Sequence, residues 1–111
     1  MVHGGGELVV VTTLDDENKA RQFAHLLVEQ RLAACVTVLP EARSYYRWQS
    51  DEIRSDSEIV LLIKTHRERL QVLEQYFREH HPYECPEIIA LDAAELSAGY
   101  RDWLRTELGL N

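Results

Sequence analysis

The segment Glu58-Ile-Val-Leu-Leu-Ile-Lys-Thr65 decides the fold of this 111-residue chain. In an extended backbone, Ile59, Leu61 and Ile63 lie on one face and the two residues between them lie on the other. A strand that is apolar on both faces is usually covered on both faces. We therefore predict that residues 58–65 form a strand inside a sheet, and that something covers each side of it.

Further strands are predicted on both sides of this segment in the chain. Residues 7–13 are nearly continuous in valine and leucine, and residues 34–39 form a second apolar run that Pro40 closes. Residues 44–48 are aromatic-rich and strand-like, and a polar turn at residues 49–52 follows them. A short strand at residues 87–91 completes the set.

Three helices are predicted between and after these strands. Asp15 and Asp16 offer an N-cap, and apolar residues then recur three and four apart as far as Leu32. The sequence Thr65-His-Arg-Glu68 fits a capping box for a second helix, which Pro82 ends. Ser97 is predicted to cap the last helix, whose inward residues are Tyr100, Trp103, Leu104 and Leu108.

The order β-α-β-β-α-β plus a C-terminal helix predicts an α+β fold of the ferredoxin-like, split β-α-β type. Its antiparallel sheet carries both helices on one face, so the other apolar face needs a cover. The C-terminal helix is expected to supply some of it and another subunit the rest, which predicts an oligomer. Residues 7–111 are expected to form a single domain. Residues 1–6 hold three consecutive glycines and are expected to be a flexible leader.

Composition excludes several classes of protein. Lysine and arginine total 12 against 19 aspartates and glutamates, and the resulting charge of −7 disfavours nucleic acid as a partner. The longest apolar stretch, residues 59–63, is far shorter than the roughly 20 residues of a membrane span. The sequence shows no secretory signal, so a cytoplasmic location is expected. Cys35 and Cys85 do not make a disulfide scaffold.

Four separated motifs are similar to the CutA divalent-cation tolerance family. They are Leu32-Ala-Ala-Cys-Val36, residues 44–48, Ile63-Lys-Thr65 and His81-Pro-Tyr-Glu-Cys-Pro-Glu-Ile88. The resemblance extends in order from about Leu8 to Leu104 without large gaps. It implies a ferredoxin-like fold, a tight homotrimer with its sheets around a three-fold axis, and a long bent hairpin.

The resemblance also implies a role in tolerance of divalent metals, and some members of the family bind copper. Some members carry a cysteine on the first strand that joins two histidines in a copper site. The histidines correspond to His80 and His81, whereas Thr12 stands where that cysteine would be. Threonine lacks the soft thiolate that favours Cu(I). The family usually has a glycine in the hairpin turn, where this chain has Ser50. It also usually has a glycine after Pro40, which corresponds to Glu41 or Ala42 here.

His80, His81 and Glu84 are the candidate metal ligands. Imidazole suits copper, zinc and nickel, and Pro82 breaks the helix so that His81 can leave helical geometry. Two imidazoles from one chain make a weak site, whose third ligand is Glu84, a water or a neighbouring subunit. The alternative is that both histidines are polar residues at a helix C-terminus, where a protonated ring relieves the helix dipole.

A second group of residues is a candidate cleft between subunits that takes a small anion or metabolite. Its members are Arg43, Tyr45, Trp48, Lys64, Tyr83 and Glu87. In the alternative interpretation, Tyr45 and Trp48 anchor an interface through packing, and Lys64 forms an ion pair with Glu87.

No motif points to catalysis. The sequence has no glycine-rich phosphate loop, no HExxH and no nucleophile elbow, so we expect no enzyme and no required cofactor. Three functions remain open. The first is a trimer that binds a divalent metal, copper foremost, weakly and acts in the response to metal ions. The second is a metabolite-sensing module, and the third is a structural trimer that presents its hairpin to a partner protein.

Overall fold

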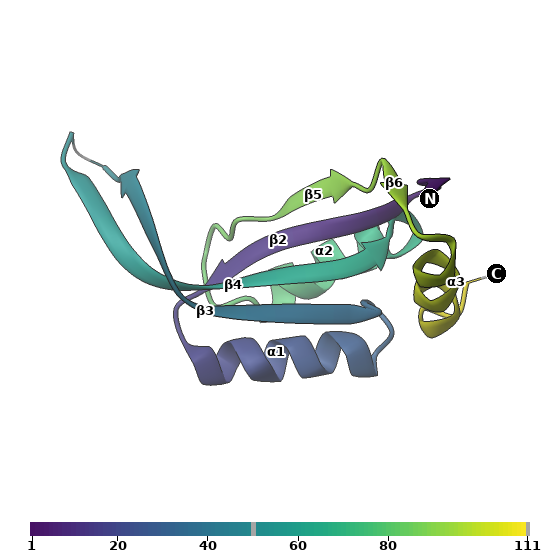
Figure 1. Cartoon of the computed structure of the whole chain (residues 1–111). Helices are drawn as coiled ribbons and strands as arrows, with labels where there is room; N and C mark the ends of the chain where they lie inside the picture. Colours follow the sequence, from purple (N-terminus) through teal and green to yellow (C-terminus); the bar gives the residue numbers. More distant parts are fainter. Residues whose placement is uncertain (50, 111) are drawn as a thin grey trace.

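The central strand of the sequence prediction is β4 (Ile53–His66), which lies inside an antiparallel sheet in a computed structural model that describes residues 1–49 and 51–110. The other strands of this sheet are β2 (Glu7–Leu14), β3 (Cys35–Arg47) and β5 (Ile89–Asp92). Their spatial order is β3-β4-β2-β5, as Figure 1 shows. This is the predicted ferredoxin-like order. The first strand of this sheet, β2, lies inside it, and the last, β5, lies at an edge.

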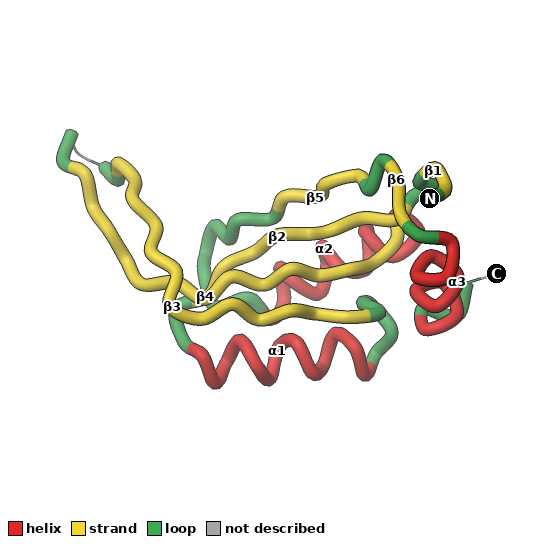
Figure 2. Tube along the Cα trace, viewed as in Figure 1, coloured by secondary structure: helices red, strands yellow, loops and turns green. Residues whose placement is uncertain are grey.

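Helices α1 (Glu17–Glu29) and α2 (Arg67–His80) run along the sheet and cover one of its faces, as Figure 2 shows. The main core lies between these helices and the sheet. Leu8, Val10, Leu61 and Ile63 contribute strand side chains to it, and each is at most 1% exposed. The helices contribute Ala20, Phe23, Ala24, Leu27, Leu73, Tyr76 and Phe77.

The opposite face of the sheet is apolar and lies bare in the single chain. Strand pairing places Val9, Val11, Cys35, Thr37, Leu39, Val60, Leu62, Lys64, Ile89 and Leu91 on it, and we call these residues the open face. Leu39, Ile89 and Leu91 are 44%, 49% and 51% exposed. The sequence analysis expected an uncovered second face, and the structure has one.

The two strand segments predicted at 34–39 and 44–48 are one strand, β3, interrupted by a bulge between Leu39 and Ala42. Glu41 has a φ of +65° there, which is left-handed backbone at one of the two positions, Glu41 or Ala42, where the resemblance expects a glycine. Beyond the bulge, β3 and β4 continue as a long arm that bends away from the sheet (Figure 1). Of the turn predicted at residues 49–52, Ser50 lies outside the described residues.

Helix α2 does not begin with the predicted capping box. Its N-cap is His66, whose Nδ1 accepts a hydrogen bond from the Glu68 backbone N–H at 3.1 Å. The Thr65 hydroxyl instead donates to the Leu32 carbonyl at 2.7 Å, far away in the sequence. The capping-box prediction was wrong because Thr65 still belongs to β4 and its side chain is buried beneath the helices.

Helix α3 (Ala98–Glu107) packs against one end of the sheet, at the opposite end from the arm (Figure 1). Leu104 and Leu108 are buried there with Ala34, in a small apolar cluster separate from the main core. Tyr100 and Trp103 were predicted to face inward, but they are 38% and 43% exposed. An amphipathic pattern predicts an apolar stripe, and α3 buries only the part of that stripe that its short contact with the sheet reaches.

Residues 1–6, expected to be flexible, are hydrogen-bonded to the rest of the fold, and we call them the strap. Strand β1 (Val2–His3) pairs with β6 (Glu95–Leu96) in a small antiparallel sheet. A Cβ on Gly4 would lie 1.8 Å from the Ala93 carbonyl oxygen, so only glycine fits there. Gly6 has a φ of +108° and lies against the His66 ring. The glycines therefore serve close contact rather than flexibility.

We expect Gly6→Ala to lower the free energy of unfolding by about 1–3 kcal/mol, since a side chain there combines positive φ with a clash. An added Cβ would lie 2.7 Å from the His66 ring. Gly99→Ala in α3 is the matched control, because its Cβ would meet nothing within 4 Å. Urea unfolding measures both, and a Gly6→Ala protein as stable as the parent would show that the strap is not tightly placed.

Candidate functional site

The adjacent residues His80 and His81 point to different environments. His80 is the last residue of α2, whereas His81 is its C-cap and has the extended angles φ −72° and ψ 133°. The break before Pro82 was predicted, and it turns the His81 ring into the protein. His81 is only 8% exposed, while the side chain of His80 is 51% exposed.

Both ring nitrogens of His81 are engaged by the protein. Nδ1 accepts a hydrogen bond from the Tyr83 backbone N–H at 3.1 Å, which assigns the ring proton to Nε2. Nε2 then donates to the Thr13 carbonyl at 3.1 Å and lies 3.2 Å from the Thr12 hydroxyl. Thr12, which replaces the cysteine of the resemblance, therefore contacts His81 directly.

The surroundings of His81 favour its neutral form. The ring lies among Phe23, Phe77 and Tyr83, with ring centroids 6.1, 5.7 and 5.1 Å away. Burial lowers the pKa of His81 below its usual 6.5, against smaller opposing effects of the Thr13 carbonyl and Asp15. A neutral imidazole is the form that binds metals, but here neither nitrogen has a free lone pair.

His80 lies outside this environment. Its ring packs on Tyr76 with centroids 4.2 Å apart, and its Nε2 lies 3.8 Å from a Glu79 carboxylate oxygen. Glu84, the third candidate ligand, is exposed and lines a cavity whose lining includes neither His80 nor His81. Among the described residues, no group of three or more histidine, cysteine, aspartate or glutamate side chains is placed to hold a metal ion. The single chain does not bring the three candidate ligands together.

Part of the candidate cleft does come together in a cavity between the outer end of β3 and the loop that follows α2. Trp48 and Tyr83 line a cavity of about 610 Å³ with Glu84 and Cys85. The Tyr83 hydroxyl donates to a Glu58 carboxylate oxygen at 3.3 Å. Burial, followed by the charges of Glu58 and Asp15, raises the pKa of Tyr83, so that its hydroxyl is a donor at neutral pH.

The other predicted cleft residues lie elsewhere. Lys64 stands on the open face, where its ammonium donates to the Thr37 hydroxyl and lies 3.8 Å from the Cys35 sulfur. Lys64 lies six positions along β4 from Glu58, or roughly 20 Å of extended chain. In the part of the chain that the structure describes, Lys64 and Glu87 form no ion pair.

The remaining members of the group are on the surface. Arg43 donates across the arm to the hydroxyls of Ser55 and Ser57, at 2.9 and 3.2 Å. Tyr45 is 71% exposed and Glu87 is also exposed. The group therefore divides into two residues that line this cavity, one lysine on the open face and three exposed side chains.

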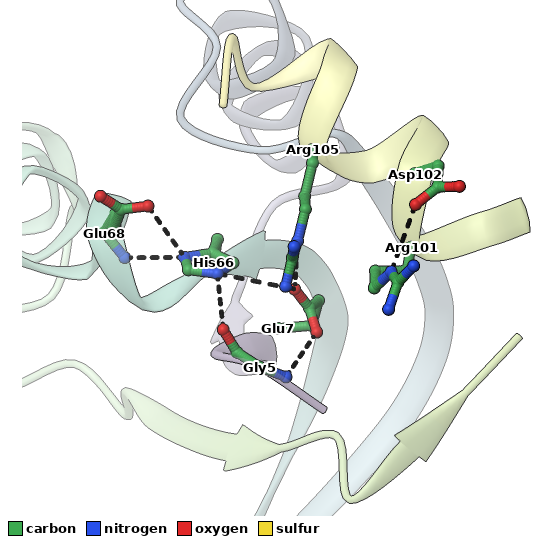
Figure 3. A network of polar contacts seen from close by, with 7 residues as sticks. All are labelled: Gly5, Glu7, His66, Glu68, Arg101, Asp102 and Arg105. Atoms are coloured by element: carbon green, nitrogen blue, oxygen red, sulfur yellow. Dashed lines mark hydrogen bonds and ion pairs between the residues drawn. The ribbon is translucent and has the colours of Figure 1, made fainter. Parts of the chain in front are cut away.

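Sequence reasoning missed a polar network at the far end of the sheet. Glu7 is 1% exposed, and its carboxylate accepts hydrogen bonds from Arg105 and from the Gly5 N–H, as Figure 3 shows. Burial by itself raises the pKa of Glu7, but these two donors outweigh it and hold the pKa below its usual value. A single glutamate at the start of a strand gives no sign of this in the sequence.

The cysteines are both free, as expected from their positions. Cys35 is half-buried at the start of β3, and Cys85 is exposed in the loop before β5. Among the described helices, none is both long and apolar enough to cross a membrane.

Comparison with known proteins decides the family. A family model described as "CutA1 divalent ion tolerance protein" matches residues 8–107. This chain belongs to the CutA1 family. The predicted family and the predicted ferredoxin-like fold are both confirmed.

Individual relatives agree with this result over nearly the whole chain. The divalent-cation tolerance protein CutA of Thermus thermophilus is 46% identical over 103 residues, which are 93% of this chain and 99% of that protein. The solved structure of that protein covers 91% of this chain and 97% of its own, with a TM-score of 0.86. The structure of CutA from Synechococcus elongatus is 38% identical, covers 96% and 94% of the two chains, and has a TM-score of 0.91.

We expect His81→Gln to lower the free energy of unfolding at neutral pH by about 1–3 kcal/mol, because it disrupts buried hydrogen bonds. It should also change the pH dependence. Above pH 6.5 His81 is neutral in both states; below that, the unfolded chain takes up the proton first, because the folded pKa is lowered. The parent therefore loses stability as the pH falls below 6.5, and the variant lacks this part of the loss.

Urea unfolding at neutral pH and about one unit below the usual histidine pKa measures both effects. His25→Gln is the control, because His25 is exposed on α1. If the parent and His81→Gln lost the same free energy of unfolding between the two pH values, His81 would not be buried in its neutral form.

Proposed function

We propose that this chain acts in divalent-cation tolerance as a cytoplasmic homotrimer without catalytic activity, and that it binds a divalent cation, copper foremost, weakly. The family match supports the role in cation tolerance. The observation that carries the assembly is the open face. An apolar sheet surface of this extent in a protein of charge −7 favours burial against another copy of the chain.

The distribution of exposed apolar side chains supports self-association. On the open face, Val9, Val11 and Leu62 are half-buried and lie next to the more exposed Leu91 and Ile89. The arm adds Tyr45, Trp48 and Ile53, which are 71%, 51% and 59% exposed. Large aromatic residues are common anchors of subunit interfaces. The three-fold symmetry itself rests on the family resemblance.

For the metal, His80 is the better ligand of the pair. Its imidazole is half-exposed and has a carboxylate neighbour in Glu79, whereas metal at His81 would have to break hydrogen bonds to the Tyr83 N–H or to the Thr13 carbonyl. One imidazole with carboxylate or water ligands gives weak binding. The replacement of cysteine by Thr12 also favours weak binding, since the Thr12 hydroxyl lies within hydrogen-bond distance of His81 Nε2.

We expect His80→Ala to weaken Cu(II) binding by about tenfold or more, because imidazole is the strongest copper ligand at this site. His81→Gln should bind Cu(II) as the parent does while being less stable. Calorimetric titration of tag-free parent and both variants measures this. Binding that disappears in His81→Gln but persists in His80→Ala would overturn the assignment, and equal binding in all three would place the metal elsewhere.

We expect Leu91→Glu to dissociate the assembly at micromolar concentration, because an unpaired carboxylate buried in an interface costs several kcal/mol. The chain should still fold, since Leu91 is 51% exposed in the single chain. Val72→Glu is the matched control: Val72 is 54% exposed on α2, in the layer on the other side of the sheet. Sedimentation equilibrium gives the masses. A Leu91→Glu protein with the mass of the parent would remove the open face from the interface.

A further inference from the structure

One buried carboxylate connects the two ends of the chain. Glu7 begins β2, directly after the strap. Its Oε2 accepts a hydrogen bond from Nε of Arg105 in α3 at 2.9 Å and lies 2.8 Å from Nη2 of the same guanidinium in an ion pair. Its Oε1 accepts from the Gly5 N–H at 2.8 Å. Figure 3 shows the carboxylate between the strap and α3. Charge-assisted, two-pronged contacts of this kind are among the stronger hydrogen bonds in proteins.

His66 completes the surroundings of Glu7 from β4. Its Nδ1 accepts from the Glu68 N–H, so its Nε2 carries the proton and donates to the Gly5 carbonyl at 3.0 Å. The same nitrogen lies 3.5 Å from the Glu7 carboxylate. The Glu68 carboxylate is 3.9 Å from Nδ1, on the outer side of the ring. The His66 side chain therefore bonds to the backbone of the strap, whereas the Glu7 carboxylate bonds to both the strap and α3.

The strap is shaped to fit this network. A Cβ on Gly5 would lie 2.7 Å from Arg105 Nη2, and a Cβ on Gly6 would lie equally close to the His66 ring. The Gly4 N–H donates to the Ala94 carbonyl at 2.9 Å, and the Arg67 N–H donates to the Gly6 carbonyl at 2.7 Å. Replacing any of the three glycines would displace a partner in the network or in the adjoining β5–β6 turn.

The apolar contacts of α3 are also separate from those of the main core. Leu104 and Leu108 form their own cluster with Ala34, and this cluster is separate from the main core beneath α1 and α2. Three residues bury far less apolar surface than the main core does. Regions with few buried apolar contacts open locally at lower free energy than the core.

We propose that the strap and α3 form a clasp that opens and closes as one unit, apart from the rest of the fold, with the Glu7 carboxylate as the group that holds it shut. Opening breaks the Arg105–Glu7 pair, and with it the hydrogen bonds that Arg31 and Arg69 donate to the Glu107 and Leu108 carbonyls at 2.6 Å each. The strap and α3 are freed together, because both are bonded to the Glu7 carboxylate. The sheet, α1 and α2 stay folded, since their core does not include α3. The clasp does not include His80, the proposed metal ligand, but it adjoins the open face, because Glu7 and His66 alternate with Val9 and Lys64 along their strands.

Hydrogen exchange in the full-length protein tests this, with peptides that report on the strap, α3 and the central strands separately. In the parent, we expect the strap and α3 to exchange at one common rate that is faster than that of β2 and β4. Glu7→Gln keeps the shape but removes the charge, and it should speed both segments by the same factor, on the order of 10- to 100-fold. The exchange of β4 should not change.

Asp102→Asn is the matched control, because it removes a carboxylate of α3 that is 70% exposed and forms an ion pair with Arg101 at 3.2 Å, outside the Glu7 network. It should leave exchange in both segments at the parent rate. If Glu7→Gln fails to fold, Arg105→Lys replaces it, since lysine keeps the charge but cannot make the two-pronged contact.

Three results would overturn the proposal. In the first, Glu7→Gln speeds exchange in α3 but not in the strap, or the reverse, so that the two segments are not one unit. In the second, β2 and β4 accelerate to the same degree, so that the opening is global. In the third, Asp102→Asn acts as strongly as Glu7→Gln, so that Glu7 has no special role.

Discussion

The structure depends on one constraint: a sheet that is apolar on both faces has a helix layer on only one of them. Burial against α1 and α2 accounts for the helix face, on which Val10, Leu61 and Ile63 are completely inaccessible to water. On the other face, Leu39, Ile89 and Leu91 remain about half exposed. The second face is therefore where the single chain leaves apolar side chains in contact with water, and Lys64 lies among them.

Much of the fold was predictable, because it follows from local periodicity. The alternation in residues 58–65 placed the central strand, and the three-and-four spacing placed both long helices. The errors arose where a distant partner decided the outcome. Thr65 bonds to the Leu32 carbonyl rather than capping α2, and the glycines of the strap are held by Ala93 and His66. A pattern within a few residues contains no information about such partners.

The candidate site was predictable in its residues but not in its geometry. The segment around Pro82 was recognised as distinctive, and both Tyr83 and Trp48 do line one cavity. The sequence could not show that one histidine of the adjacent pair is buried, because this depends on how the backbone turns after α2. It also could not show that Thr12 lies beside His81, 69 residues away in the chain.

The bulge in β3 has a consequence for how this family can vary in length. Between Leu39 and Ala42, β3 has two intervening residues, Pro40 and Glu41, where β4 has one, Ile59. Loss of one of these two residues would leave a single residue opposite Ile59, so the ladder between β3 and β4 would become regular. Arg43 would then keep its place opposite Ser57 on β4. A single-codon deletion would therefore remove the bend that the bulge adds to the arm, while the side chains of the arm keep their faces.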